Sequence, residues 1–186
     1  KTFEVNTLST ITIINSIEEL NIRTKKFMFV GTSAQYKSSG EKKIKEETDL
    51  SPSSPYAISK IAAEQYLKIK CLEIGIDLII FRPFYFIGAH KKGDFSSELA
   101  KQIILIEKGK KEFLELGNIN LIRDFLDVRD GVEAIKKLIE FGVPFTNYNV
   151  CSGKGTNLKD LLKLFINESS VKINYKLDKT LIRSNE

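Results

Sequence analysis

Hydrophobic and polar residues alternate along the chain in blocks that predict helices and strands in turn. Apolar residues recur at helical spacing in residues 3–20 and again in 56–73, and Gly75 supplies a stop signal after the second block. Two short apolar runs, 25–30 and 77–83, are bounded by turn residues and are too short for helices, so each predicts a buried strand. This order of helices and strands predicts a parallel sheet covered by helices.

After Pro83 the pattern becomes less regular, with glycines and short apolar runs between charged residues. Further elements are still predicted: a helix near 96–108, strands at 113–116 and 124–127, a helix to about Phe141 capped by Asp127 or Asp130, a strand at 148–151, a helix at 157–165 and a strand at 171–175. The chain is therefore expected to be of the α/β class throughout.

Charge and composition exclude several classes of protein. The 29 Lys and Arg residues exceed the 24 Asp and Glu residues by five, but the two signs are interleaved, which indicates solvated surface rather than a nucleic-acid-binding stripe. No apolar run approaches the roughly 20 residues that span a bilayer, and the start has no secretion signal, so we expect a cytoplasmic protein without membrane contact. One His and two distant Cys predict no metal site.

The segment Tyr56-Ala-Ile-Ser-Lys60 is the most informative candidate for chemistry. Four residues make about one helical turn, so the Tyr56 hydroxyl and the Lys60 ammonium can share a helix face. A cation favours the phenolate, and such a pair suits proton transfer to or from a carbonyl or carbinol oxygen. An exposed pair on an amphipathic helix would show the same spacing. Upstream, the apolar run 25–30 ends in hydroxyl-bearing residues at 32–33, at the strand end where open α/β sheets bind ligands.

Six segments in this order resemble the extended short-chain dehydrogenase/reductase family, which reworks nucleotide sugars. They are Val5-Asn-Thr-Leu-Ser-Thr10, Val30-Gly-Thr-Ser-Ala-Gln-Tyr36, Pro55-Tyr-Ala-Ile-Ser-Lys60, Arg82-Pro-Phe84, Arg123-Asp-Phe-Leu-Asp-Val-Arg-Asp130 and Tyr148-Asn-Val-Cys-Ser-Gly153. The motifs are most similar to those of the GDP-6-deoxy-D-mannose reductase branch, in which NAD(P)H reduces a GDP-linked 4-keto-6-deoxy sugar to the GDP-rhamnose type of product.

The resemblance implies a role for each matching residue. The catalytic residues would be Thr32, Tyr56 and Lys60, with Tyr56 as the proton donor and Thr32 on the C4 oxygen. NADP or NAD would be bound by Tyr56, Lys60, Pro83 and Phe84. The nucleotide-sugar substrate, with a GDP-sugar favoured, would be bound by Thr32, Ser33, Tyr85, Arg123 and Arg183. Guanidinium groups suit the diphosphate because they form bidentate bonds to its oxygens.

Departures from the family pattern sharpen the expectation. Ala34 stands where the family's 4,6-dehydratases carry an acid, and a methyl group cannot shuttle a proton, so dehydratase chemistry is disfavoured. Tyr85 and Phe86 replace Asn and His, Lys37 replaces a Gly, and Leu181 replaces an Arg.

The 11 glycines form no G-x-G-x-x-G or G-x-x-G-x-x-G loop, which opens the family fold. We therefore expect an incomplete Rossmann-like doubly wound parallel sheet with a small α/β C-terminal substrate-binding part. Residues 1–84 would be the C-terminal half of the NAD(P)-binding domain, joined by 127–151, and residues 85–126 and 152–186 the substrate part. On this hypothesis the chain by itself binds cofactor weakly.

Two other functions stay open. One is a nucleotide-sugar 4-epimerase that retains NAD and uses the same three catalytic residues, and the other is an inactive remnant that only binds. The resemblance also implies a homodimer formed through helices 3–20 and 56–74, although core packing explains the apolar residues of these helices equally well.

Overall fold

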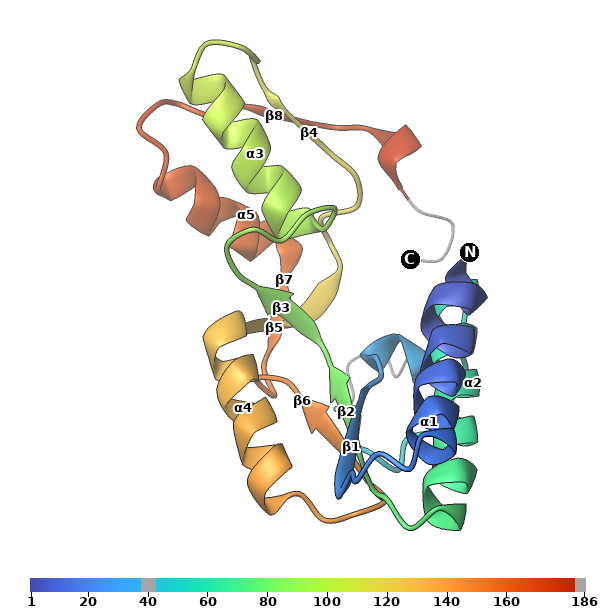
Figure 1. Ribbon diagram of the computed structural model, residues 1–186. Coiled ribbons are helices and arrows are strands. Elements are labelled where there is room, and N and C mark those ends of the chain that lie inside the picture. Colours follow the sequence, from blue (N-terminus) through green and yellow to red (C-terminus); the bar gives the residue numbers. More distant parts are fainter. Residues whose placement is uncertain (38–42, 183–186) are drawn as a thin grey trace. The chain divides into compact units, whose positions relative to one another are not determined.

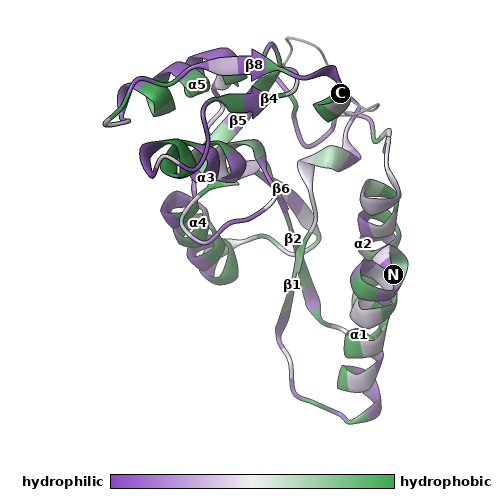
Figure 2. Ribbon diagram, turned by 90° about the horizontal axis from the view of Figure 1, so that it is seen from above, coloured by the Kyte–Doolittle hydropathy of each residue, from purple (hydrophilic) through white to green (hydrophobic). Residues whose placement is uncertain are grey.

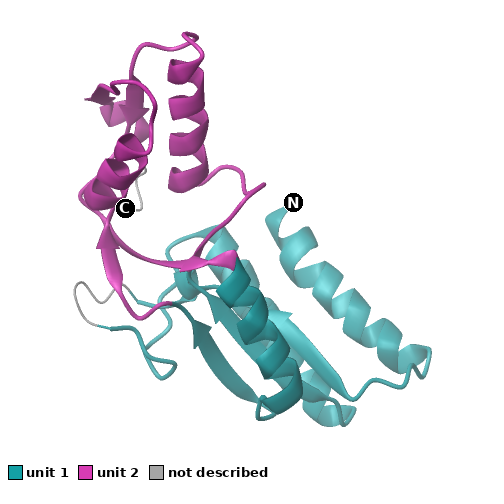
Figure 3. Cartoon of the chain, turned by 90° about the vertical axis from the view of Figure 1, so that its left-hand side faces the viewer, with its two compact units in different colours: residues 1–84, 129–151 teal, residues 85–128, 152–186 magenta. Residues whose placement is uncertain are grey.

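The computed structural model describes residues 1–37 and 43–182. These residues form two compact units, coloured separately in Figure 3. The first consists of residues 1–84 and 129–151, and the second of residues 85–128 and 152–186. The chain thus leaves the first unit after residue 84, returns to it at residue 129 and leaves it again after residue 151, and each unit is a small α/β structure of its own.

A three-stranded parallel sheet lies at the centre of the first unit. Its strands β1 (Lys26–Val30), β2 (Asp77–Pro83) and β6 (Thr146–Val150) follow one another in that order across the sheet (Figure 1). Lys26 is paired with Asp77, and Ile79 with Thr146. Because all strands run the same way, their carboxyl ends meet at one edge.

Helices α1 (Ser9–Glu19), α2 (Pro55–Glu73) and α4 (Val128–Phe141) surround this sheet, and a π-helical turn, Glu4–Leu8, leads into α1. Side chains of α1 and α2 pack against those sheet residues, at every second position, that point toward these helices. The resulting core consists of Ile14, Phe29, Ala63, Leu67, Cys71, Ile76, Leu78 and Ile80. Ile79, which points to the opposite face, lies at the end of α4, near Gly142. Both faces of the sheet are therefore covered, which explains the almost uninterrupted apolar sequence of β2.

The second unit contains two small sheets and two helices. Strands β3 (Tyr85–Ile87), β5 (Ile122–Asp127) and β7 (Gly155–Asn157) form one sheet, in which β5 is parallel to β3 and antiparallel to β7. Strands β4 (Leu114–Leu116) and β8 (Tyr175–Leu177) form the other. Helices α3 (Phe95–Glu107) and α5 (Leu158–Asn167) are amphipathic, as both colours along them in Figure 2 show. Their apolar residues pack around Leu99, Leu114 and Leu162.

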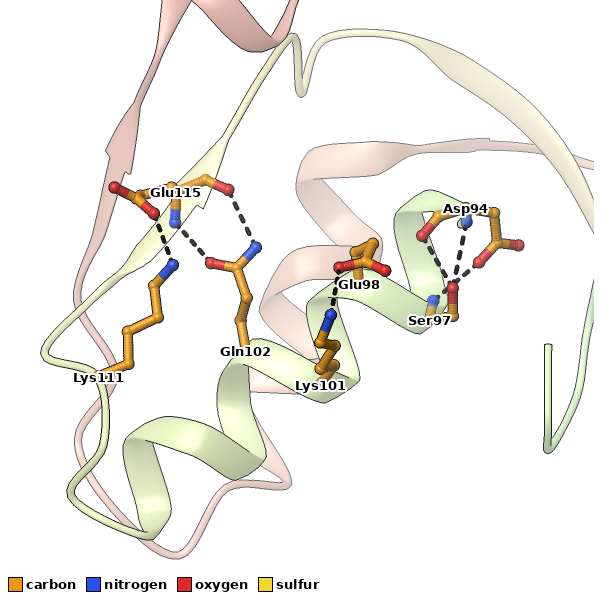
Figure 4. A network of polar contacts seen from close by, with 7 residues as sticks. All are labelled: Asp94, Ser97, Glu98, Lys101, Gln102, Lys111 and Glu115. Atoms are coloured by element: carbon orange, nitrogen blue, oxygen red, sulfur yellow. Dashed lines mark hydrogen bonds and ion pairs between the residues drawn. The ribbon is translucent and has the colours of Figure 1, made fainter. Parts of the chain in front are cut away.

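Polar contacts fix the start of α3 and its attachment to β4 (Figure 4). The Asp94 carboxylate accepts from the Ser97 backbone N–H at 2.8 Å, and the Ser97 hydroxyl lies 3.2 Å from the Asp94 backbone N–H, which makes a reciprocal cap. Further along α3, the Gln102 amide accepts from the Glu115 backbone N–H and donates to the Glu115 carbonyl. Gln102 thus occupies the backbone groups of β4 that another strand would use.

Most predicted elements are confirmed, and the α/β class with a parallel sheet is confirmed with them. The last strand is misplaced, since the sequence predicts a strand at 171–175 and β8 covers Tyr175–Leu177. The apolar signal came from Ile173, which is buried in the core of the second unit from an irregular segment. Strands β3 and β7 have no alternating pattern and were missed. Asp130 lies within the first turn of α4 and does not precede the helix as a cap would.

Neither a membrane-spanning helix nor a metal-binding cluster occurs among the described residues. No helix there is long and apolar enough to cross a bilayer. No group of three or more His, Cys, Asp or Glu side chains in the same part of the chain is arranged to hold a metal ion.

Candidate functional site

The Tyr56–Lys60 pair lies in the first turns of α2, beside the carboxyl end of β1. Ser54 caps the helix by accepting from the Ala57 backbone N–H at 3.2 Å, and Pro55 occupies the first helical position. Tyr56 is 44% exposed, and its hydroxyl has no hydrogen-bond partner among the described residues. The helix start therefore presents a phenol that a ligand can reach.

The Lys60 side chain connects α2 to the end of β1. Its Nζ donates to the carbonyl oxygen of Val30 at 2.9 Å and lies 5.2 Å from the centre of the Phe29 ring. Burial lowers the pKa of Lys60, because the half-buried ammonium has lost part of its hydration. One of the three ammonium hydrogens is used by Val30, and two remain for a ligand.

Thr32 stands two residues beyond the carbonyl that Lys60 contacts. Its backbone is extended, and its side-chain oxygen accepts from the Ala34 N–H at 3.2 Å. The preceding Gly31 continues the sheet by donating its N–H to Phe81 O at 2.7 Å. Thr32 is only 8% exposed, so the chain holds its hydroxyl close to the strand end. The sequence-predicted residues Thr32, Ser33 and Lys60 are thus brought together, with Tyr56 one helical turn from Lys60.

A buried polar network lies directly behind this site. The Arg82 guanidinium donates to both carboxylate oxygens of Glu64, at 3.2 Å and 2.5 Å, and to the Tyr36 hydroxyl at 2.8 Å. Tyr36 in turn donates to the Asn149 side-chain oxygen at 2.7 Å. Arg82 is 1% exposed and Glu64 fully buried. The network therefore joins α2, β2, β6 and the segment after β1.

The pKa values in this network follow from burial and pairing. Burial raises the pKa of Tyr36, although its hydrogen bonds with Arg82 and Asn149 work against that rise. Burial also opposes the charge of Arg82, but the hydrogen bonds with Glu64 and Tyr36 outweigh it and raise the Arg82 pKa. The tyrosine is thus held neutral and the arginine charged.

Glu64 is the functional candidate that the sequence prediction missed. It stands eight residues after Tyr56 and four after Lys60, at the same helical step that singled out the pair. The second available signal is Arg82, a charged residue in a strand that is otherwise apolar from Leu78 onward. A buried charge needs an opposite partner, so Arg82 required an acid nearby.

Polar contacts also attach the first helical segment to α2. The Asn6 side chain donates to the Ser59 hydroxyl at 3.0 Å, and the Thr7 hydroxyl donates to the Ser59 carbonyl at 2.8 Å. Ser59 lies between Tyr56 and Lys60 on α2. The N-terminal helix thus supports the part of α2 that carries the pair.

The remaining predicted residues fall elsewhere. Pro83 ends β2, and Phe84 donates its backbone N–H to Val150 O at 3.0 Å, so that this donor is already used. Tyr85 and Arg123 belong to the second unit, where the Arg123 guanidinium lies 5.4 Å from the centre of the Tyr85 ring. Arg183 lies outside the described residues.

A nicotinamide cofactor fits the residues at the strand end of the first unit. Lys60 offers two ammonium hydrogens beside Val30, a suitable arrangement for ribose hydroxyls, and the exposed Tyr56 leaves room at the helix start. Ligands of open α/β sheets bind at this edge.

Comparison with known proteins agrees with this architecture. The resemblance to the extended short-chain dehydrogenase/reductases is confirmed, because residues 1–185 match a model of one of their families and the fold recurs in solved members. The chain belongs to the family described as GDP-mannose 4,6 dehydratase.

Two relatives illustrate the range of activities in this group. GDP-6-deoxy-D-mannose reductase of Pseudomonas aeruginosa is 31% identical over 100% of this chain, and the chain covers 62% of that protein. GDP-6-deoxy-D-talose 4-dehydrogenase of Aggregatibacter actinomycetemcomitans is 26% identical over 98% of this chain, which covers 60% of that enzyme. The chain thus spans less than two thirds of the length of these relatives.

Solved structures give the same picture. The RMD protein of P. aeruginosa, solved with NADPH, superposes with a TM-score of 0.88 at 29% identity, over 95% of this chain and 60% of that one. UDP-glucose 4-epimerase of Thermus thermophilus, solved with NAD, has a TM-score of 0.82 at 21% identity, over 99% of this chain and 60% of that one, and shows the fold alone.

Proposed function

We propose that this chain carries the proton-transfer residues of an NAD(P)H-dependent reductase that acts on a nucleotide-linked 4-keto-6-deoxy sugar, of the GDP-4-dehydro-6-deoxy-mannose type. The observation that carries the proposal is the position of Lys60, whose ammonium reaches Val30 O at the end of β1 while Tyr56 stands exposed one helical turn earlier. Similarity to the P. aeruginosa reductase over the whole chain supports the choice of reaction.

The proposed chemistry assigns one task to each residue. When it is bound in its reduced form, the cofactor (NADP or NAD) would supply the hydride that C4 of the sugar receives, and would leave oxidised. Tyr56 donates its phenolic proton to the C4 oxygen, and Thr32 donates a hydrogen bond that holds this oxygen. Lys60 binds the nicotinamide ribose, and its positive charge stabilises the phenolate that proton transfer leaves behind. Ser33 contacts the sugar, and Pro83 and Phe84 line the nicotinamide pocket.

Arg123 is proposed to bind the diphosphate of the substrate. Its Nη1 donates to the Ile122 carbonyl at 2.9 Å, and the Tyr85 ring lies beneath its guanidinium. It forms no ion pair with any described acid, so its charge is available for an anion. Its neighbour Asp124 accepts instead from the Ser152 N–H and hydroxyl. Arg183 is proposed as a second phosphate ligand from the family motif alone.

The two units receive different roles in this proposal. The first, with the parallel sheet, is the C-terminal half of the cofactor-binding domain, and the second is the substrate part. Reduction is favoured over dehydration because the methyl group of Ala34 stands where the dehydratases need an acid. A 4-epimerase with tightly held NAD would use the same three residues.

The protein is also proposed to form a homodimer through helices 3–20 and 56–74. The apolar residues Val5, Leu8, Ile58, Ile69 and Leu72 on these helices are exposed. Exposed apolar residues gathered on two neighbouring helices are a feature of many interfaces between subunits. Light scattering at several protein concentrations should give twice the monomer mass, and Ile69→Glu should lower it to the monomer value.

Turnover tests the reaction directly. The chain is expressed with all coding sequence contiguous with it, and NADPH oxidation is followed with GDP-4-dehydro-6-deoxy-mannose as substrate. We expect Tyr56→Phe to lose 10²- to 10⁴-fold of the rate. Tyr66→Phe is the matched control, because its hydroxyl, on the same helix, donates to Asn15 and its ring packs against the core. Isomerisation at C4 of a nucleotide sugar that carries a C4 hydroxyl, tested separately and without net loss of NADPH, would identify the epimerase. Equal turnover in both variants would contradict an active Tyr56.

A further inference from the structure

The buried network behind the strand end connects every part of the first unit to which catalytic residues were assigned. Glu64 lies on α2, one turn after Lys60 and two turns after Tyr56. Arg82 comes directly before Pro83 at the end of β2. Tyr36 stands four residues after Thr32, at the end of the short 3₁₀ turn Ser33–Gln35 that follows the strand end.

The guanidinium of Arg82 bridges these parts by three hydrogen bonds. Two of them go to the two oxygens of one carboxylate, an arrangement that restricts both distance and angle. A third goes to Tyr36 Oη at 2.8 Å. Because Arg82 and Glu64 are almost completely buried, neither can exchange its partner for water. This fork therefore restricts the position of α2 relative to the strand ends.

The backbone leaves room for the side chain that makes the bridge. A Cβ atom added to Gly31 would lie 3.2 Å from Arg82 Cγ, closer than ordinary side-chain contacts. Gly31 also precedes Thr32 and is bonded to β2 through Phe81 O. The stem of Arg82 therefore passes directly beneath the residue before Thr32, so a displacement of Arg82 is transmitted to that strand end.

The ends of the network are also fixed. At one end, Glu64 accepts a hydrogen bond from Lys68 Nζ at 3.0 Å. At the other end, the Tyr36 hydroxyl donates to the Asn149 side chain, and the Asn149 backbone N–H donates to Glu46 Oε1 at 2.9 Å. Asn149 is on β6, so all three strands or their extensions are included. An unbroken chain of polar contacts with both ends held is rigid in a way that a single ion pair is not.

From these contacts we infer that Arg82 is a positioning residue: through its fork to Glu64 and its bond to Tyr36, it sets Tyr56 and Lys60 of α2 at the correct distance from Thr32. The inference rests on the proposed function for the identity of the reacting groups. It assigns to Arg82 no contact with substrate or cofactor. Its action is on geometry, and geometry affects the chemical step more than it affects binding.

The test uses Arg82→Lys, which keeps the charge but loses the fork, in the same full coding context as above. We expect kcat to fall by about 100-fold, as small misplacements of catalytic groups do, while KM and the Kd for NADPH stay within about threefold. Lys136→Gln is the control, because it removes a solvent-exposed ion pair with Glu133 in the same unit, and its kcat should equal that of the wild type. An unchanged kcat in Arg82→Lys would overturn the inference, as would a change confined to KM.

Tyr36→Phe keeps the fork and removes only the hydroxyl. We expect a kcat about 3- to 10-fold below the wild type. Should Arg82→Lys fail to fold by circular dichroism, this isosteric variant decides, and a kcat equal to the wild type would then reject the inference.

A spectroscopic measurement separates this inference from the proposed reaction. In protein labelled with 3-fluorotyrosine, the ¹⁹F resonance that disappears in Tyr56→Phe belongs to Tyr56. We expect Arg82→Lys to shift or broaden this resonance, and Lys136→Gln to leave it unchanged. Absence of turnover in the wild type would reject the proposed function, but the ¹⁹F measurement would still test the position of Tyr56. A Tyr56 resonance that Arg82→Lys leaves unchanged would reject the positioning role, whether or not the wild type turns over.

Discussion

Loss of Glu64 and loss of Arg82, the partners of the buried ion pair, should lower the stability of the protein by unequal amounts. Replacing Glu64 by Gln leaves the Arg82 guanidinium buried with the Tyr36 hydroxyl and a neutral amide as its partners, and an arginine cannot lose its charge at any ordinary pH. Removing one partner of a buried pair costs about 3–5 kcal/mol. Replacing Arg82 by Met is expected to cost less, about 2–3 kcal/mol, because Glu64 keeps Lys68 at 3.0 Å.

These costs are large against the roughly 5–15 kcal/mol that stabilises a typical domain. Native-state hydrogen exchange read by mass spectrometry gives the free energy of opening for peptides of β2 and α2 separately. This choice avoids treating a chain with two compact units as a single two-state system. A cost below about 1 kcal/mol for Glu64→Gln, or a larger cost for Arg82→Met than for Glu64→Gln, would refute the reasoning.

Three further predictions concern single side chains. Asp94→Ala should lower the stability of the second unit by about 1 kcal/mol in urea unfolding. Burial opposes the ionisation of Asp94, but hydrogen bonds from Lys91 and Ser97 outweigh it and lower the Asp94 pKa. The stabilisation by this cap is therefore full above pH 4 to 5 and is lost as the pH falls through the lowered pKa. Lys60→Met should abolish turnover yet change the free energy of unfolding at pH 7 by less than about 1 kcal/mol. Burial lowers the Lys60 pKa, so the charged form costs stability below that pKa, and this cost should vanish as pH rises past the unfolded value near 10.4. Iodoacetamide at pH 8 should alkylate Cys151 long before Cys71, whose buried thiol has a pKa raised to about 11; mass spectrometry of the peptides would show the opposite order if this is wrong.

Sequence reasoning was most successful where one hydrophobic period extends over a whole element. Strand β2 is apolar from Leu78 to Phe81, and α2 repeats its apolar residues over five turns, so both were located to within a residue or so. It failed at β7, a strand of only three residues whose pairing with β5 depends on tertiary contacts. The segment around Ile173 shows the opposite error, a strand predicted where there is none. Burial of an apolar residue in an irregular segment gives the same apolar signal as a strand.

The candidate site divides in the same way. The helical step from Tyr56 to Lys60 could be recognised from spacing, because both residues belong to one helix. The bond from Lys60 to Val30 and the fork from Arg82 to Glu64 join residues 30 and 18 positions apart, and no local pattern specifies such distant pairs. Residue types alone indicated only that a charge as deeply buried as that of Arg82 would need an acidic partner.

We propose the Tyr56 hydroxyl as the proton donor for reduction of a nucleotide-linked 4-keto sugar. Single-turnover oxidation of NADPH by the protein in its full coding context, with Tyr56→Phe and Tyr66→Phe compared at saturating substrate, tests it most directly. We expect a rate 10²- to 10⁴-fold lower for Tyr56→Phe and an unchanged rate for Tyr66→Phe. A Tyr56→Phe protein that oxidises NADPH as fast as the wild type would contradict it.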